Sequence, residues 1–463
     1  MSAREKPTVI SLFTGAGGLD YGLEAAGFHT SVAIELDEEA CKTLKHNRPK
    51  WKIIQKSVSD VTADELLSAS HLKRRGVDLI VGGPPCQPFS KAANWARKNG
   101  RAPGLNDNRA STVSKFMDVV EMVLPKVVLL ENVDGFASGG QNSGELFVTN
   151  RFNTINKSAG TSYRPVSSLL NAADFGVPQA RRRRFIVAAR SGHMFEFPSA
   201  THGEGREPYV TAWDALGDDE PGDEPLQLSG QWADLLPTIP EGQNYTWHTS
   251  RGGGQLLFGW RCRYWTFLLK LAKNRPSWTI QAHPGPAAGP FHWKNRKLSI
   301  RELCRLQTFP EDVEIKGIRS AAVRQVGNAV PSLMAEVLGR AIRRQLLGHH
   351  PQRQPSLLLN RRRGMPEAEK PRPVPKKYHH LIGRHPDHPG TGRGPGARKR
   401  DGASPAEQTK DPAWHTVLGF DEAPERVGHQ SLGRSAECLI PRSEELSIPV
   451  SAAFGGRTCL GRR

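Results

Sequence analysis

The sequence predicts an α/β fold with a mostly parallel sheet and a second, smaller and irregular domain. Short apolar segments alternate with helical patterns over residues 1–190, as they do in βα units. From 191 to 297 the pattern dissolves among prolines, glycines and tryptophans, and it returns in two amphipathic segments over 298–349. Residues 350–463 are rich in Arg, Pro, Gly and His, so we expect a basic, mostly disordered tail.

Composition limits the class of protein. The 463 residues carry a formal net charge of +18, which favours a polyanionic partner such as nucleic acid, unless the basic tail alone accounts for the excess. The sequence contains no apolar run of 18 residues and no signal-peptide pattern. Its six cysteines are scattered without zinc-ligand spacing. We therefore expect a soluble cytoplasmic protein with no membrane contact and no metal.

The first predicted strand is followed by a glycine-rich turn. Residues 9–13 form the strand, Gly15, Gly17 and Gly18 form the turn, and residues 19–26 have helical spacing. Glycines between a strand and a helix let the backbone approach a ligand at the helix N-terminus. The order of glycines differs from the dinucleotide-binding GxGxxG pattern, so this turn alone indicates no particular ligand.

Acidic residues follow the next two strands. Glu35 comes after the strand at 31–34, about 20 positions beyond the glycines, where a carboxylate is placed to bind ribose hydroxyls. Asp60 comes after the strand at 53–58. This carboxylate either reaches an adenine amino group or caps the helix that begins near residue 62, and the sequence leaves both interpretations open.

The stretch VDLIVGGPPCQPFS, residues 77–90, places Cys86 directly after a buried strand and two prolines. A lone cysteine is often a small buried hydrophobic residue. The prolines before Cys86 and the Gln-Pro-Phe-Ser after it instead predict an exposed loop, which suits a nucleophile. The following basic residues, 91–109, predict a mobile loop over a phosphate backbone.

Five candidate residues share one position in the predicted fold, because each follows the end of a strand. They are Gly15, Glu35, Asp60, Cys86 and Glu131, the last of which follows the strand at 126–130. Ligands bind beyond the carboxyl ends of the strands in an open parallel sheet. The set therefore predicts a single ligand site at that edge.

Four consecutive arginines precede a further strand at 185–189. Because alternate side chains of a strand share a face, we expect Gln179, Arg181 and Arg183 to point together toward the site. The irregular region includes HTSRGGGQLLFGWRCRYW, residues 248–265, whose basic and aromatic residues suit contact with a nucleic-acid groove. Its tryptophans are expected to be mostly core.

Six motifs in this order resemble those of the DNA cytosine-5 methyltransferase family, from Val9 to about Ile342. They are FTGAGG (13–18), GGPPCQPFS (82–90), ENV (131–133), QARRR (179–183), RELCRLQTFP (301–310) and QVGNAVP (325–331). The resemblance implies a Rossmann-like S-adenosylmethionine-dependent methyltransferase sheet. It makes 1–190 the catalytic, cofactor-binding domain, 191–297 the target-recognition domain and 298–349 the segment that completes the catalytic domain.

The resemblance also assigns roles to single residues. Cys86 would add to C6 of cytosine, Glu131 would supply a proton at N3, Arg183 would hold O2, and Arg181 would order the site. The cofactor S-adenosylmethionine would be bound by Phe13, Gly15, Gly17, Gly18, Glu35, Asp60, Pro85 and Asn328. DNA would be contacted by Gln87, Ser90, Arg109, Gln179, Arg261 and Thr279.

The implied activity is methyl transfer to C5 of a flipped-out cytosine in a specific short duplex DNA sequence. The resemblance is to bacterial enzymes, so the partners would be double-stranded DNA and a functionally cognate restriction endonuclease, against which methylation protects host DNA. The chain is expected to act as a monomer. Two alternatives stay open, namely an RNA (tRNA) cytosine-5 methyltransferase and a catalytically inactive DNA-binding relative.

Overall fold

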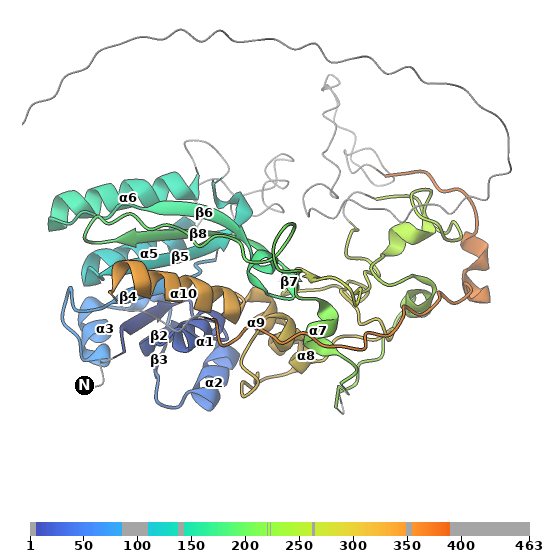
Figure 1. The fold of residues 1–463 in the computed structure, drawn as a ribbon, viewed down its shortest axis with the longest axis horizontal. Coiled ribbons are helices and arrows are strands. Elements are labelled where there is room, and N and C mark those ends of the chain that lie inside the picture. The colour runs from blue at the N-terminus through green and yellow to red at the C-terminus, as the bar shows by residue number, and fades with distance from the viewer. Residues whose placement is uncertain are drawn as a thin grey trace, which may run out of the picture. The chain divides into compact units, whose positions relative to one another are not determined.

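A seven-stranded sheet lies at the centre of the fold, in the order β3-β2-β1-β4-β5-β8-β6 (Figure 1). The first five strands in the chain pair in parallel. They are β1 (Thr8–Leu12), β2 (His29–Glu35), β3 (Lys52–Gln55), β4 (Leu79–Gly82) and β5 (Val127–Val133). Strand β8 (Arg182–Ala189) runs antiparallel to both β5 and β6 (Val166–Asn171). The predicted mostly parallel sheet is therefore confirmed.

The computed structural model describes only part of the chain in detail. The described residues are 6–85, 110–137, 143–219, 221–222, 224–261, 264–348 and 354–388. All of them belong to one unit of the structure, residues 1–403. Among the described residues no helix is both long and apolar enough to span a membrane.

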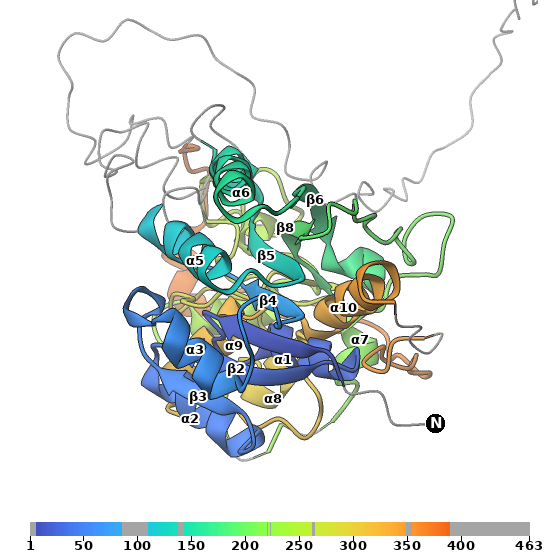
Figure 2. The ribbon, with the colours of Figure 1, turned by 90° about the vertical axis from the view of Figure 1, so that its left-hand side faces the viewer.

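Helices cover both faces of the sheet, which Figure 2 shows with α5 and α6 on one side and α10 on the other. The helices are α1 (Gly18–Ala25), α2 (Glu38–Asn47), α3 (Ala63–Ser70), α5 (Ala110–Val123), α6 (Gly144–Ala159) and α10 (Ser332–Leu346). Strands buried on both faces read as continuous apolar runs, which is why 79–81 and 127–130 lack a polar alternation.

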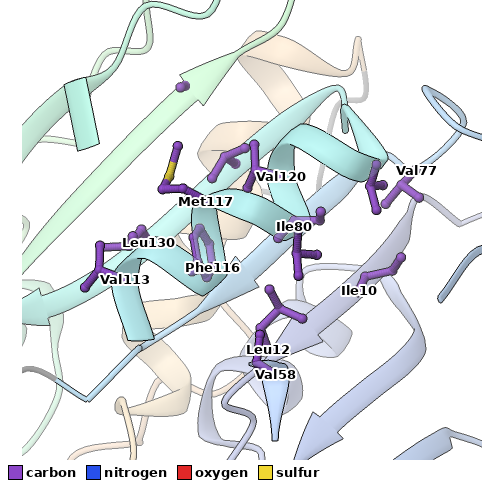
Figure 3. Packing of buried hydrophobic residues seen from close by; sticks show 14 of the residues in the cluster. Ile10, Leu12, Val58, Val77, Ile80, Val113, Phe116, Met117, Val120 and Leu130 are labelled. Atoms are coloured by element: carbon purple, nitrogen blue, oxygen red, sulfur yellow. The ribbon is translucent and has the colours of Figure 1, made fainter. Parts of the chain in front are cut away.

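The strands alternate between two cores. Ile10, Leu12 and Ile80 point to the core that contains Phe116 of α5, as Figure 3 shows. Their neighbours in sequence, among them Val9, Leu79 and Val81, point to the opposite core, which contains residues of α1 and α10. Each fully buried side chain of this size contributes about 1.5–3 kcal/mol to stability. The two cores hold the strand ends, and hence the loops after them, in fixed positions.

A third core joins the sheet to the irregular region. Trp213 of α7 (Ala212–Leu216) and Trp293 are buried there, with ring centroids 6.2 Å apart, together with Tyr21 of α1. Helices α8 (Ile300–Leu306) and α9 (Arg319–Asn328) contribute Leu303 and Val326 to the same core. Parts of the 191–297 region thus share a core with the sheet-covering helices.

A fourth core has little regular secondary structure around it. It contains Leu235 and Leu236 of η5 (Ala233–Thr238), together with Leu257 and Phe291. The other short elements of the region are η6 (Tyr245–His248) and the pair β7 (Gln179–Ala180) and β9 (Ser277–Trp278), which are parallel. The expectation of an irregular second region is met by this part of the structure.

The expectation of a mostly disordered tail does not hold for residues 354–388. This segment runs from α10 to the fourth core (Figure 1). There η7 (Lys376–Leu381) contributes the buried Tyr378. Composition predicts disorder because the segment has too few apolar residues for a core of its own. It gains order by docking onto a core built by other residues. Residues 389–463 lie outside the described residues.

Candidate active site

Glu131 and Arg183 form a buried pair where β5 and β8 run side by side. In the antiparallel register Glu131 lies opposite Phe185, and Arg183 lies opposite Val133. Arg183 Nε is 3.0 Å from Glu131 Oε1. Burial raises the pKa of the Glu131 carboxyl, while Arg183 and Arg181 act against the rise. Burial is the largest of these effects, so the carboxyl keeps its proton to a higher pH than an exposed glutamate.

Arg181 lies deeper, almost fully buried, between three segments of the chain. Its Nη2 donates to Gly327 O at 2.9 Å, its Nη1 donates to Ile280 O at 3.3 Å, and its backbone N–H donates to Asn171 Oδ1. Burial and the neighbouring Arg183 lower the pKa of this guanidinium. Arg181 therefore positions the strand that carries Arg183 against the segment that leads into Asn328.

The glycine–proline loop after β4 runs directly past Glu131. A side chain at Gly83 would place its Cβ 2.8 Å from Glu131 Oε2, so glycine lets the loop pass this close without displacing the Glu131 carboxyl. Asn132 Nδ2 donates to Pro84 O at 3.2 Å, and Thr112 Oγ1 donates to Pro85 O at 2.9 Å. These bonds hold the loop at the carboxyl edge of the sheet.

Several predicted residues follow this loop but lie outside the described residues. They are Cys86, Gln87, Ser90 and Arg109. The part of the loop that precedes Cys86 lies beside Glu131.

The glycine turn after β1 has the tight geometry that its composition predicts. Gly17 has a φ of +86°, in the left-handed region, and it directly precedes Gly18 at the start of α1. Glu35, at the end of β2, accepts hydrogen bonds from Gly15 N at 2.6 Å and from Asp37 N at 2.7 Å. Gly15 and Glu35 therefore lie side by side at the ends of β1 and β2.

The other predicted cofactor residues lie at different places. Phe13, with φ of +54°, packs half-buried against the core beneath the sheet. Pro85 and Asn328 are exposed, Asn328 at the end of α9. Asp60 is exposed at the end of η1 (Val58–Asp60). It does not cap α3, because Thr62 Oγ1 accepts from Glu65 N, so the capping interpretation of Asp60 is wrong.

These residues fit S-adenosylmethionine better than a dinucleotide. The glycine turn and Glu35 lie together beyond the parallel strands, where a nucleoside binds in such sheets. Carboxylates at Glu35 and Asp60 suit ribose hydroxyls and an amino group, and they do not suit phosphates. Phe13, directly after β1, is half-buried.

The residues predicted to contact DNA differ in how deeply the structure buries them. Gln179 is completely buried: it donates to Leu306 O and Gln307 Oε1 and accepts from Ile280 N. A side chain enclosed in this way has no surface to offer to DNA, so the predicted DNA contact of Gln179 does not hold in this structure. Thr279 is half-buried and donates to Ala180 O at 2.8 Å.

Arg261 is exposed, with its guanidinium 5.8 Å from the centre of the Tyr264 ring. Exposure on the irregular region is compatible with the predicted DNA contact, and the role of Arg261 stays a prediction.

Two buried polar residues near the site were given no role from the sequence. Gln307 donates to Val326 O at 2.7 Å while accepting from Gln179, and it ties α8 to the end of α9. Asn132 holds the proline loop. Gln307 lies in the RELCRLQTFP motif and Asn132 in the ENV motif. Membership of these motifs was the sequence signal that could have identified them.

The two described cysteines, Cys41 and Cys304, are poor nucleophiles. Burial raises the pKa of the Cys41 thiol to about 11 and that of Cys304 to about 12, so neither is a thiolate at neutral pH. Within the described part of the chain, no group of three or more His, Cys, Asp or Glu side chains is arranged to hold a metal ion.

Comparisons with known proteins identify the family. The family model of C-5 cytosine-specific DNA methylases matches residues 7–344. The Type II methyltransferase M.SacI of Streptomyces achromogenes is 37% identical over 371 residues, which cover 73% of this chain and 93% of that protein. The Type II methyltransferase M1.HphI of Haemophilus parahaemolyticus is 31% identical, with 72% and 86% covered.

Solved structures show the same fold. A structure described as a DNA modification methyltransferase encoded within an E. coli prophage has a TM-score of 0.53 at 22% identity, covering 74% of this chain and all of that one. The S. pombe Dnmt2 methyltransferase has a TM-score of 0.50 at 17% identity, with 73% and 99% covered. The fold prediction is thereby confirmed. With its sheet, its Glu131–Arg183 pair and its family match over 7–344, the chain belongs to the C-5 cytosine-specific DNA methylase family and is a DNA cytosine-5 methyltransferase.

Proposed function

We propose that the protein methylates C5 of one cytosine in a short, specific sequence of duplex DNA, through a covalent adduct between Cys86 and C6 of the base. The observation that carries the proposal is the buried Glu131–Arg183 pair, against which the chain leading to Cys86 is packed. The proton donor and the cation of the proposed reaction lie together at the end of β5 and β8, and the described loop that precedes Cys86 lies beside them.

Glu131 acts as the acid in this reaction. Addition of the Cys86 thiolate to C6 moves negative charge toward N3 of the ring, and a proton at N3 neutralises it. The raised pKa of Glu131 leaves a proton on the carboxyl to donate. An ionised carboxylate can only accept hydrogen bonds. Glu131 can donate a proton only while its carboxyl is neutral, and burial favours that neutral form.

Arg183 supports the same step from β8. Its guanidinium, 3.0 Å from Glu131 through Nε, fixes the orientation of the carboxyl and carries further N–H donors for the O2 edge of the base. Arg181 acts behind it by fixing the strand. Loss of the C5 proton and elimination of Cys86 complete the sequence and release the product base.

The cofactor is held by the residues at the ends of β1 to β4. Glu35 binds the ribose, Asp60 the adenine amino group and Phe13 the adenine ring, while the glycine turn and Asn328 shape the pocket. S-adenosylmethionine supplies the methyl group as an electrophile. The protein's part is to place the base against it and to exclude water.

Duplex DNA is the proposed substrate because the relatives are Type II methyltransferases and because the chain has a recognition region with its own core. A base within a duplex must leave the stack to reach a buried site, at a cost of about a few kcal/mol. We propose that the enzyme acts as a monomer and that its methylation protects DNA from an endonuclease with the same target sequence.

Bisulfite sequencing of plasmid DNA from cells that express the protein tests this function. We expect one short sequence to be methylated at one cytosine in every copy, and Cys86→Ser to leave the plasmid unmethylated. Methylation of transfer RNA with unmodified DNA would favour the RNA alternative. Absence of methylation from both would favour an inactive DNA-binding protein.

A further inference from the structure

Residues 354–388, which we call the C-terminal strap, lie beyond the family match at 7–344 and yet contact both halves of the structure. In Figure 1 the strap leaves the neighbourhood of α10, passes α8 and α7, and ends in the irregular region. The reaction described above assigns it no role. The contacts that the strap makes along its length indicate a role for it.

The first anchor is Glu336 on α10, which is fully buried. Its carboxylate accepts hydrogen bonds from Ser356 N at 2.6 Å, Ser356 Oγ at 3.1 Å and Leu357 N at 2.9 Å. Leu357 and Leu358 pack against the core that α10 shares with the sheet. The start of the strap is therefore fixed to the catalytic part of the molecule.

The second anchor is α7. Asp214 accepts from Arg362 N at 2.9 Å and from Arg361 Nη1 at 3.0 Å, while Arg362 pairs with Asp219 at 3.1 Å. Burial acts to raise the pKa of Asp214, but hydrogen bonds from Thr211 and Arg362 N, with the charge of Arg361, hold it below its ordinary value. The middle of the strap is thus bound to the third core.

The third anchor is the fourth core. Tyr378 is only 3% exposed and is stacked on Trp232, with ring centroids 6.0 Å apart. Its hydroxyl donates to Gln231 O at 2.6 Å. Val374 and Leu381 pack against the same core. An aromatic side chain in such a position contributes strongly to local stability, so this core depends on the strap.

The end of the strap braces the loop at 249–261. Asp387 Oδ1 accepts from Trp260 N at 2.9 Å, and His388 N donates to Trp260 O at 2.6 Å. Asp387 also pairs with Arg251 at 3.3 Å, and the Arg251 guanidinium lies 3.8 Å from the centre of the Trp260 ring. This loop carries the exposed Arg261 and belongs to the basic, aromatic stretch that suits a nucleic-acid groove.

We infer that the C-terminal strap positions the 249–261 loop for DNA recognition and ties that loop to the catalytic sheet. The loop has no helix or strand of its own, so its conformation depends on hydrogen bonds from Tyr245–His248 at one end and from the strap at Trp260. Asp387 acts as a positioning residue, since it orders Arg251 and Trp260. The inference rests on the proposed DNA methylation and adds the segment that sets DNA affinity and sequence choice.

Steady-state kinetics of full-length Asp387→Ala on plasmid DNA carrying the methylated sequence test the inference. We expect the KM for DNA to rise about tenfold, the effect of losing a charge-assisted hydrogen bond and its ion pair. The turnover at saturating DNA and the calorimetric affinity for S-adenosylmethionine should stay within about twofold. Asp387→Asn, which keeps an acceptor for Trp260 N, should recover part of the loss.

Two further variants keep the test decisive. Tyr378→Ala should raise the KM for DNA and add methylation at near-cognate sequences in bisulfite reads, whereas Tyr378→Phe keeps the ring and should resemble the wild type. Asp64→Ala, an exposed change on α3, is the matched control for Asp387→Ala. Wild-type KM and methylation pattern in both Asp387→Ala and Tyr378→Ala would overturn the inference. An inactive wild type would instead overturn the proposed function.

Discussion

Replacement of Glu131 by glutamine tests the role of the buried acid. Glutamine keeps the size of the side chain but has no acidic proton to give to N3 of the base. It also leaves Arg183 without the carboxylate that lies 3.0 Å from its Nε. We expect the chemical step to be affected far more than cofactor binding, because Glu35 and the glycine turn lie at the ends of other strands.

The magnitude follows from the chemistry of proton transfer. A positioned general acid contributes about 10²–10⁴-fold to a rate, which corresponds to about 3–5 kcal/mol of barrier. The pH dependence has a definite sign. Because burial raises the pKa of Glu131, the proton is present at low pH and is lost as the pH rises through the raised value. The same proton favours the folded state below the ordinary glutamate pKa. This contribution to stability is lost as the pH rises from the ordinary pKa through the raised pKa of Glu131.

Single-turnover methylation of duplex DNA, with calorimetric titration of S-adenosylmethionine, measures the two effects separately. We expect a fall in rate of about 10²-fold or more in Glu131→Gln and cofactor affinity within about twofold of the wild type. Glu207→Gln, at an exposed position, is the control. Equal losses of rate and of cofactor affinity, or a wild-type rate, would refute the assignment.

Three other variants test the surroundings of the site and the core. Gly83→Ala should reduce turnover strongly, because its Cβ would lie 2.8 Å from Glu131 Oε2, whereas Gly285→Ala meets no such obstacle and should leave turnover unchanged in the same assay. Burial raises the pKa of Asp20 to about 7, so ionisation of this side chain should cost up to about 4 kcal/mol of stability as the pH rises from 4 to 8. In Asp20→Asn the denaturant midpoint should therefore vary less with pH across that range than it does in the wild type. Phe116→Ala should lower the free energy of unfolding by about 3–5 kcal/mol in denaturant titrations, and an unchanged midpoint would contradict the core described for it.

Much of the sheet could be predicted because local pattern determines it. Apolar runs at 79–81 and 127–130 become parallel strands buried on both faces, and the glycines after β1 form the turn that their spacing predicts. That the turn and Glu35 lie at one edge follows from the parallel order of the strands. The strands and the turn themselves need only the chain near each residue.

Contacts between distant segments could not be predicted in this way. Strand alternation placed Gln179 on the side of Arg183, but it gave no sign that Ile280 and Gln307 would enclose the side chain. The strap is the clearest case. Its composition predicts disorder, and contacts with distant parts of the chain order it, at Glu336, at Asp214 and at the core that takes in Tyr378.

The choice between Asp60 and Thr62 shows a finer limit. Both residue types favour the start of a helix, and the sequence does not say on which of them the helix begins. In the structure Asp60 ends a 3₁₀ turn and Thr62 provides the cap, which leaves the Asp60 carboxylate exposed. The functional interpretation of Asp60 is strengthened only because the competing structural one has been removed.

Trapping of the enzyme on DNA tests the central claim most directly. A duplex with 5-fluorocytosine at the target position has no C5 proton to lose, so an enzyme that adds through Cys86 stays attached after methyl transfer. Intact-protein mass spectrometry should show a stable protein–DNA adduct that requires S-adenosylmethionine. The adduct should form with Cys304→Ser, whose thiol is buried with a pKa near 12, and be absent with Cys86→Ser. An adduct that persists in Cys86→Ser, or none with an active wild type, would contradict the account.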